Sequence, residues 1–305
     1  AVAGADVVGI RSRTRLDADA LRAATSLTAI GCFCIGTNQV DLAAAAARGV
    51  PVFNSPFGNT RSVAELTLAE IVLLHRGVAD RSAELHRGEW RKTAAGSREV
   101  RGRTLGIVGY GHIGSQLSVL AEGLGMSVVF FDIAHRLPLG NALAAASLED
   151  LLERSDVVSL HVPATPITAG MIGAAELARM KPGAFLLNNA RGSLVDLDAA
   201  AEALRSGRLG GIAVDVYPSE PEANGPGFSC PLSGVPGAIL TPHIGGSTEE
   251  AQETIARDVA DKLARHALAG STRSAVNVPE VDLPQRRDGQ HRILHYHRNV
   301  PGVLG

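Results

Sequence analysis

A stretch in the middle of the chain, residues 103–132, limits the possible folds more than any other part. An apolar run, Leu105–Val108, leads into the glycine-rich turn Gly109–Gly114, which opens a segment with apolar residues at helical spacing. A second apolar run, Val128–Phe131, ends at Asp132. This order of strand, glycine turn, helix, strand and acid is typical of a dinucleotide-binding unit with parallel strands.

The glycines of this turn have separate predicted roles. Gly109 allows the tight turn out of the strand, Gly111 lets a pyrophosphate approach the backbone, and Gly114 lets the helix pack close to the strand. The free amides and the dipole at the start of the helix favour phosphate groups. Asp132 is expected to accept hydrogen bonds from the ribose hydroxyls and to repel a 2′-phosphate, so the predicted cofactor is NAD rather than NADP.

Length and composition narrow the number of domains, the class of partner and the compartment that we expect. The chain has 305 residues, enough for about two domains, and a net charge of −2, which argues against a nucleic-acid or membrane partner. The low cysteine count predicts a reducing compartment, and Cys32 and Cys34 are interpreted as buried strand residues rather than metal ligands, so no metal is expected. Without a long apolar run or a signal-peptide pattern, we expect a cytoplasmic protein.

The alternation of strand and helix patterns predicts an α/β fold with two interleaved domains. Residues 1–58 read as β-α-β-α-β, a flavodoxin-like arrangement, and a helix after Gly246 returns to the same domain, predicted as 1–58 with 246–284. A Rossmann domain is predicted for 59–245, inserted between these two parts, with a cleft at the carboxyl ends of the strands. One long helix is predicted over Ser62–Leu85, opened by a capping box of Ser62 and Glu65.

Three polar side chains follow successive predicted strands and could do chemistry together. Arg191 lies in NNARGS, Glu220 in DVYPSEP and His243 in LTPHIGG. The ordinary pKa of a histidine suits proton transfer near neutral pH, and a nearby Glu220 would orient the ring and stabilise the imidazolium. An arginine can bind a carboxylate through two hydrogen bonds. Each residue alone is more often structural, but the set indicates a nicotinamide enzyme acting on a hydroxyl carbon.

These residues, in their contexts, resemble the D-2-hydroxyacid dehydrogenase family, and within it the bacterial-type members that have a C-terminal ACT regulatory domain. The resemblance is carried by IGCFCIGTNQVDL, NTRSVAEL, AAGS, GIVGYGHIG, LPLGNA, SDVVSLHVP, MKPG, DVYPSEP and LTPHIGGSTEEAQE. It implies NAD-dependent oxidation of 3-phospho-D-glycerate to 3-phosphonooxypyruvate, the first step of L-serine synthesis. Reduction of 2-oxoglutarate is implied as a side activity. It also implies that about 50 residues precede this sequence, and that residues 285–305 are a linker and the start of a truncated ACT domain.

The resemblance also assigns further residues. Those expected at the cofactor, besides the glycines and Asp132, are His112, Ile113, Pro163, Ala190, Asp215, Gly245 and Gly246. Those expected at the substrate are Arg11, Ser12, Arg13, Asn59 and Lys92. For Lys92, a solvated charge at a helix end is an equal alternative. The sequence departs from the family pattern at Asn189 and Ala190, where a small residue followed by serine is more usual.

The last part of the sequence resembles the serine-binding motif of ACT domains through His297, Asn299 and Gly302. L-serine is therefore expected as a feedback effector, and a homo-oligomer, a dimer or tetramer, as the assembled state. Two other functions remain open: a D-2-hydroxyacid dehydrogenase for glycerate, lactate or a similar acid, and an NAD(H)-sensing corepressor on the same fold.

Overall fold

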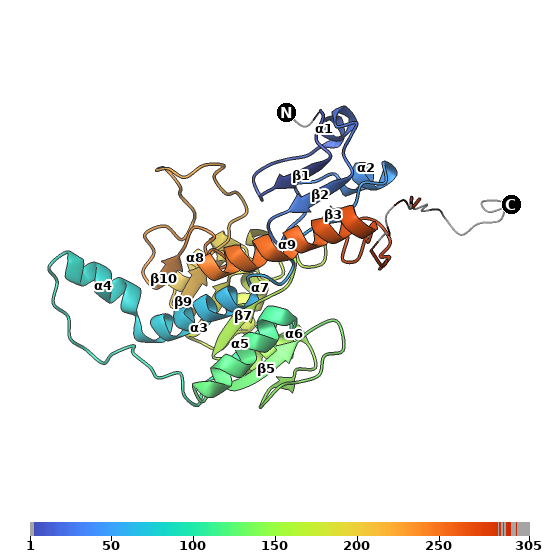
Figure 1. The fold of residues 1–305 in the computed structure, drawn as a ribbon. Helices are drawn as coiled ribbons and strands as arrows, with labels where there is room; N and C mark the ends of the chain where they lie inside the picture. Colours follow the sequence, from blue (N-terminus) through green and yellow to red (C-terminus); the bar gives the residue numbers. More distant parts are fainter. Residues whose placement is uncertain (1–2, 286, 288, 290, 294–296, 298–305) are drawn as a thin grey trace. The chain divides into compact units, whose positions relative to one another are not determined.

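The structure, a computed structural model, describes residues 3–285, 287, 289, 291–293 and 297. It forms two compact units (Figure 1). Unit 1 comprises residues 1–59 and 249–305, and unit 2 comprises residues 60–248. Within the described residues, no helix is both long enough and apolar enough to cross a membrane.

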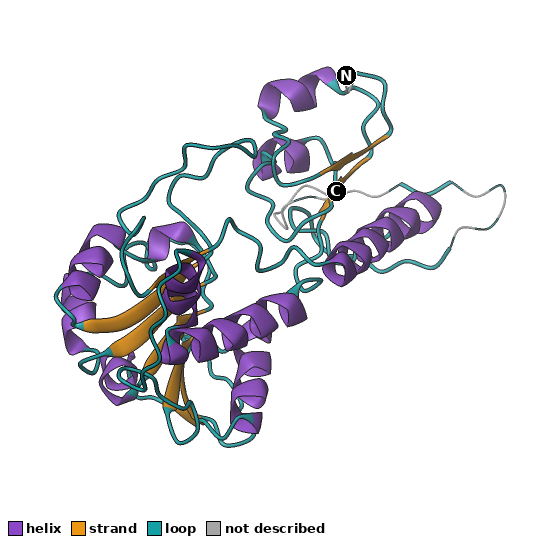
Figure 2. Ribbon diagram, turned by 90° about the vertical axis from the view of Figure 1, so that its left-hand side faces the viewer, coloured by secondary structure: helices purple, strands orange, loops and turns teal. Residues whose placement is uncertain are grey.

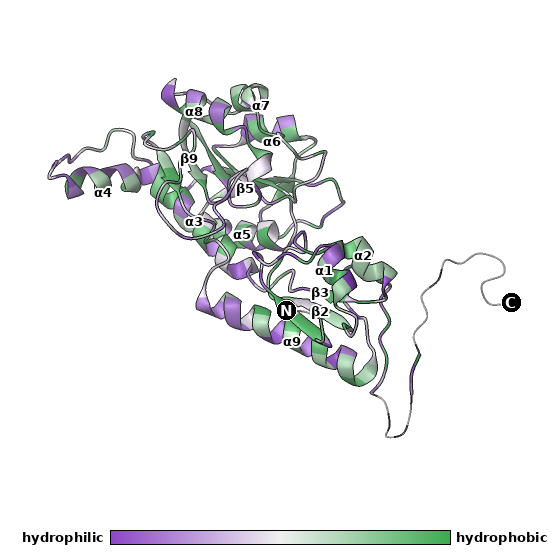
Figure 3. Cartoon of the chain, turned by 90° about the horizontal axis from the view of Figure 1, so that it is seen from above, coloured by the Kyte–Doolittle hydropathy of each residue, from purple (hydrophilic) through white to green (hydrophobic). Residues whose placement is uncertain are grey.

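Unit 1 has a small parallel sheet and a long helix packed against it. Its strands, in the order β1-β2-β3, are β1 (Val7–Ile10), β2 (Ala29–Cys32) and β3 (Val52–Phe53). Its helices are α1 (Ala18–Ala23), α2 (Leu42–Ala47) and α9 (Glu249–Ala269). Helix α9 packs on β2 and β3, and its hydropathy divides into a polar and an apolar side (Figure 3). A Cβ on Gly31 would lie 2.7 Å from Leu263 Cδ1, so the backbone of β2 packs closely against this helix.

Unit 2 is a doubly wound parallel sheet with helices on both faces (Figure 2). Its seven strands run in the order β10-β9-β8-β7-β4-β5-β6. The strands are β4 (Thr104–Val108), β5 (Ser127–Phe131), β6 (Leu143–Ala144), β7 (Val157–Leu160), β8 (Ala184–Asn188), β9 (Leu209–Val214) and β10 (Ala238–Leu240). The helices are α3 (Thr60–Arg76), α4 (Val78–His86), α5 (His112–Gly123), α6 (Leu148–Arg154), α7 (Ala174–Arg179) and α8 (Leu197–Arg205), with a 3₁₀ turn at Gly192–Leu194.

The alternation of side chains along each strand explains the two helical layers. In β8, Phe185 and Leu187 belong to the core under α3 and α5, whereas Leu186 belongs to the core under α6, α7 and α8. Successive strand residues point to opposite faces, so a strand buried on both faces has an apolar residue at every position. The predicted parallel Rossmann-type α/β fold is confirmed.

The helix predicted over Ser62–Leu85 is wrong in its length and in its cap. Gly77 has a φ of +57° and ends α3, so the chain turns before α4 begins at Val78. Instead of a capping box, Glu65 pairs with Arg61 at 2.5 Å and Ser62 Oγ bonds Thr248 Oγ1 at 2.8 Å. A left-handed glycine does not break the apolar spacing, and therefore the sequence pattern runs through it.

The glycine turn is a tightly packed point of unit 2. Gly109 has a φ of +93°, and a Cβ there would lie 2.5 Å from the carbonyl oxygen of His161. A Cβ on Gly114 would lie 2.3 Å from the carbonyl oxygen of Gly109 and 2.9 Å from Ile107 Cγ2. Since the closest contact of each added Cβ would be with a backbone oxygen, no side-chain movement can relieve it.

Gly114→Ala should therefore lower the free energy of unfolding by about 1–3 kcal/mol, the usual cost of overpacking. Gly123→Ala is the matched control, because it lies in the same helix and its Cβ would meet nothing within 4 Å. It should leave stability unchanged or raise it by up to about 1 kcal/mol. Urea unfolding measures both values, and equal stability of the two variants would contradict the packing argument.

Candidate active site

The first part of the candidate site is the start of α5. Gly111 precedes this helix, and a Cβ there would meet nothing within 4 Å, so the backbone is open to an incoming group. The first-turn amides of a helix have no intrahelical acceptor and bind anions readily. His112 is exposed and Ile113 packs partly against the core. The chain's own residues thus fit a pyrophosphate at this position.

Asp132, just beyond β5, joins this turn to the next strand. Its Oδ2 accepts from the amide of Tyr110 at 2.9 Å and its Oδ1 from the amide of Ala134 at 2.8 Å. The Arg136 Nε lies 3.4 Å from Oδ2, and the Asp132 side chain is only 10% exposed. A carboxylate fixed in this way, beside the glycine turn, suits hydrogen bonds from ribose hydroxyls.

The second part lies beyond β9 and β10, which are neighbours in the sheet. His243 Nδ1 and Glu220 Oε2 are 2.8 Å apart, and the amide of Tyr217 donates to Glu220 Oε1 at 3.2 Å. The His243 side chain is 52% exposed. Because Glu220 binds one ring nitrogen, it presents the other, Nε2, to a reacting group. The structure therefore brings together two of the three predicted catalytic residues.

His243 has a φ of +56°, a left-handed conformation that non-glycine residues rarely adopt. The side chain of Asp215 stabilises the turn that contains His243. Its Oδ1 accepts from the Ile244 amide at 2.8 Å and from Thr241 Oγ1 at 2.6 Å, and its Oδ2 from the Gly245 amide at 2.7 Å. Asp215 is 1% exposed, so this buried carboxylate fixes the turn that carries His243.

Arg191, the third predicted catalytic residue, follows β8, the strand next to β9. The Asn188 amide nitrogen donates to the Arg191 carbonyl at 2.9 Å, and Arg191 Nη1 donates to the Ala190 carbonyl at 2.6 Å. The Arg191 side chain is exposed. A Cβ on Gly192 would lie 2.0 Å from the carbonyl carbon of Tyr217, so this turn packs directly on the segment that leads to Glu220.

The remaining predicted residues are more scattered. In unit 1, Arg11, Ser12 and Arg13 follow β1 and are exposed, Arg11 donates to Gln252 Oε1 at 2.5 Å, and Asn59 is half-buried. In unit 2, Lys92 is exposed in the segment after α4, Pro163 follows β7, and Gly246 follows the His243 turn. His297 is described, but Asn299 and Gly302 lie outside the described residues. The described residues contain no cluster of His, Cys, Asp and Glu that could hold a metal ion.

Sequence reasoning missed one polar cluster at this site. The Asn189 side chain turns to α3, where its Nδ2 donates to Glu70 Oε2 at 2.6 Å and to Thr67 Oγ1 at 3.0 Å. Burial raises the pKa of Glu70 to about 7. The hydrogen bond from Asn189 lowers this pKa, and the negative charge of Asp215 raises it further. A charged residue within the apolar positions of α3 was the available signal, and Asn189 stands out in the sequence only as a departure from the family pattern.

Comparison with known proteins agrees with this geometry. Residues 68–245 match the family described as D-isomer specific 2-hydroxyacid dehydrogenase, NAD binding domain. The chain is 58% identical over 297 residues to D-3-phosphoglycerate dehydrogenase of Haemophilus influenzae, covering 97% of this chain and 72% of that protein. It is 56% identical over 298 residues to the protein of the same name from Dictyostelium discoideum, covering 98% and 73%.

Solved structures show the same relationship. The TT0316 protein from Thermus thermophilus has a TM-score of 0.77 at 37% identity, covering 88% of this chain and 83% of that chain. D-lactate dehydrogenase from Aquifex aeolicus, complexed with NAD and lactic acid, has a TM-score of 0.78 at 27% identity, covering 92% and 89%. The predicted cofactor, NAD, is confirmed. The chain belongs to the D-isomer-specific 2-hydroxyacid dehydrogenases and is an NAD-dependent oxidoreductase.

Proposed function

We propose that this chain oxidises 3-phospho-D-glycerate to 3-phosphonooxypyruvate, the first step of L-serine synthesis. The hydrogen bond between His243 and Glu220 is the observation that supports the proposal most directly, because a histidine held through Nδ1 after the strands of an NAD-binding domain could accept a proton at Nε2. The name shared by relatives at 58% and 56% identity supports this choice of substrate.

In the proposed mechanism, the three residues divide the work. Arg191 binds the substrate carboxylate, and His243 Nε2 accepts the proton of the C2 hydroxyl. Glu220 accepts from Nδ1–H, which fixes the tautomer and stabilises the imidazolium that forms. NAD, when bound, accepts the hydride from C2. Arg11, Ser12, Asn59 and the basic residues Arg13 and Lys92 are proposed to bind the rest of the substrate, including its phosphate.

The proposal also includes an effector and a cellular compartment. L-serine is proposed as a feedback effector, on the resemblance of the segment His297–Gly302 to a serine-binding motif. The proposed compartment is the cytoplasm, because the cysteine count is low and a soluble metabolite is the proposed substrate.

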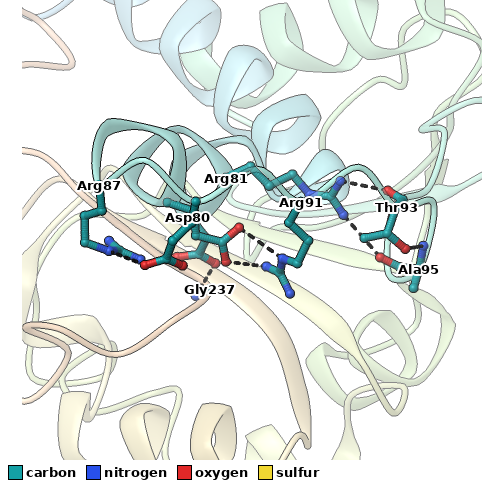
Figure 4. Close-up of polar contacts among 9 residues, drawn as sticks. Asp80, Arg81, Arg87, Arg91, Thr93, Ala95 and Gly237 are labelled. Carbon is teal, nitrogen blue, oxygen red and sulfur yellow. Dashed lines mark hydrogen bonds and ion pairs between the residues drawn. The ribbon is translucent and has the colours of Figure 1, made fainter.

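We also propose that the chain assembles as a homo-oligomer through an arm formed by residues 77–97. Helix α4 in this arm has no buried residue. Arg81 donates to the carbonyls of Thr93 and Ala95 at 2.9 and 3.2 Å, and Asp80 accepts from the Gly237 amide at 2.9 Å (Figure 4). The hydrogen bonds of Arg81 thus hold the arm together. Its apolar side chains are exposed to solvent, with Trp90 81% exposed.

An assay of NADH formation over a panel of 2-hydroxy acids, repeated with L-serine, tests the proposed function. Turnover should be greatest with 3-phospho-D-glycerate and should fall when serine is added. The reverse assay with 2-oxoglutarate measures the side activity. Turnover only with an unphosphorylated acid would favour another dehydrogenase of the family, and NADH binding without any turnover would favour a corepressor.

His243→Ala should lower kcat by about 10² or more, because it removes the general base. Glu220→Gln keeps a partner for the ring but removes the charge that stabilises the imidazolium, so its loss should be smaller. The exposed His291→Ala in unit 1 is the control and should have parental kcat. An active His243→Ala enzyme would exclude the proposed base.

Asp132→Ser should weaken NAD binding and improve NADP binding, because it removes the carboxylate and frees Arg136 for a 2′-phosphate. The double variant Asp132→Ser/Arg136→Ala should lose the gain in NADP binding while keeping the weaker NAD binding. Fluorescence titration with both cofactors measures the preference. If the single variant keeps the parental preference, the ribose role of Asp132 is wrong.

Trp90→Glu should lower the mass in solution to that of a smaller assembly, since it places a charge in the proposed interface. Val119→Glu is the control, because Val119 is an exposed apolar residue of α5 outside the arm. Light scattering coupled to gel filtration measures both masses. An unchanged mass for Trp90→Glu would rule out the arm as the interface.

A further inference from the structure

A buried acid, Glu70, lies behind the strand end that carries Arg191. It is in the middle of α3, a helix that packs on β8 and β9, and it is 1% exposed. Its Oε2 accepts from the Asn189 amide nitrogen at 2.6 Å, and the same nitrogen donates to Thr67 Oγ1 at 3.0 Å. Both protons of the Asn189 amide are therefore used by α3.

Two acceptors in this cluster have no partner among the described residues. Glu70 Oε1 and Asn189 Oδ1 are buried and neither makes a hydrogen bond there. Thr67 cannot serve them, because its hydroxyl donates to the Val63 carbonyl at 2.8 Å. A buried acceptor that has lost its water without gaining a donor destabilises the folded state. The cluster is therefore one proton short when Glu70 is ionised.

One proton on Glu70 supplies the missing donor. A carboxylic acid and a primary amide can form a closed pair, in which the amide N–H donates to one carboxyl oxygen and the acid O–H donates to the amide oxygen. The first of these hydrogen bonds is the one observed between Asn189 and Glu70. The second would join the two atoms that have no partner. Protonation also removes the cost of a buried charge.

The charge of Asp215 favours the same state. Among the neighbours of α3, strand β8 has no titratable side chain, and β9 leads to the buried carboxylate of Asp215, which raises the pKa of Glu70. Helix α5 has His112 and Glu122, of which Glu122 accepts from the Asn141 amide. Helix α4 begins beyond the last turn of α3. Its titratable residues are Asp80, Arg81, Glu84 and His86.

We propose that Glu70 and Asn189 are positioning residues, and that their neutral acid–amide pair fixes the strand end leading to Arg191. The proposal deepens the proposed function, on which its catalytic part rests. Asn189 is followed directly by Ala190 and Arg191, so we expect the hold on the Asn189 side chain to fix the backbone that carries Arg191. An ionised Glu70 would leave two bare acceptors and place a second negative charge near Asp215, which fixes the His243 turn.

The pH dependence of stability follows with a definite sign. The pKa of Glu70 is raised from 4.5 to about 7, so the folded state binds this proton more tightly than the unfolded state. The resulting stabilisation is complete below pH 4.5, is lost as the pH rises to about 7, and does not change further above that. In Glu70→Gln, the amide of the introduced side chain supplies the same donor at every pH, so this loss should be absent.

The first experiment measures thermal unfolding of the full chain between pH 4.5 and about 8. Relative to Glu70→Gln, the parent should lose several degrees in Tm as the pH rises to about 7. Glu65→Gln is the matched control, because Glu65 is an exposed residue of the same helix, and its curve should follow the parent. Parallel curves for the parent and Glu70→Gln would overturn the neutral pair. Since no turnover is measured, this result does not depend on the proposed function.

The second experiment measures kcat and KM with the best acid of the panel. Glu70→Ala should lower kcat by roughly tenfold or more, as expected when a group is misplaced, and Glu70→Gln should restore it. Asn189→Asp places two carboxyl groups together, so its kcat, taken as a ratio to that of the parent at the same pH, should be low near neutral pH and rise as the pH is lowered. Equal kcat in Glu70→Ala and Glu70→Gln would overturn the positioning role. A parent inactive with every acid would refute the proposed function and leave the thermal result standing.

Discussion

The candidate active site depends on one buried carboxylate, Asp215. Three donors from the segment after β10 converge on it, and two of them are the amides directly after His243. Hydrogen bonds to a charged acceptor are stronger than those between neutral groups. These hydrogen bonds offset the cost of the left-handed backbone conformation at His243. That cost arises because the residue at this position is not a glycine. The position of His243 is thus set by the main chain rather than by its own side chain.

This anchoring explains how a partly exposed histidine can be well oriented. The surface pair of His243 and Glu220 alone would contribute little, since exposed ion pairs are screened by water. The turn beneath it is fixed from inside the unit, and Glu220 is itself fixed by the Tyr217 amide. Tyr217 in turn donates its hydroxyl to the carbonyls of Val214 and Thr241, which ties the two strand ends together.

Much of this arrangement could be predicted from the sequence. The glycine turn and its acid have a fixed local geometry, so the residues from Leu105 to Asp132 predict a strand, a helix and a second strand without knowledge of the rest. The parallel order of the sheet follows from the alternation of elements. The break at Gly77 could not be predicted, because it depends on one backbone angle within an otherwise continuous apolar pattern. Neither could the edge strand β6, which has two residues.

The Glu70 cluster shows the limit of reading residues one at a time. Glu70 and Asn189 are 119 positions apart, and nothing in the sequence context of either residue points to the other. Their relation depends on how α3 lies across β8, which is a property of the folded unit. The two buried acids of this site also differ in a way that no sequence pattern records: among the described residues, Asp215 accepts from three donors, whereas Glu70 accepts from one. Because hydrogen-bond donors stabilise a carboxylate, Glu70 has less compensation for a buried negative charge than Asp215 has, in keeping with its raised pKa.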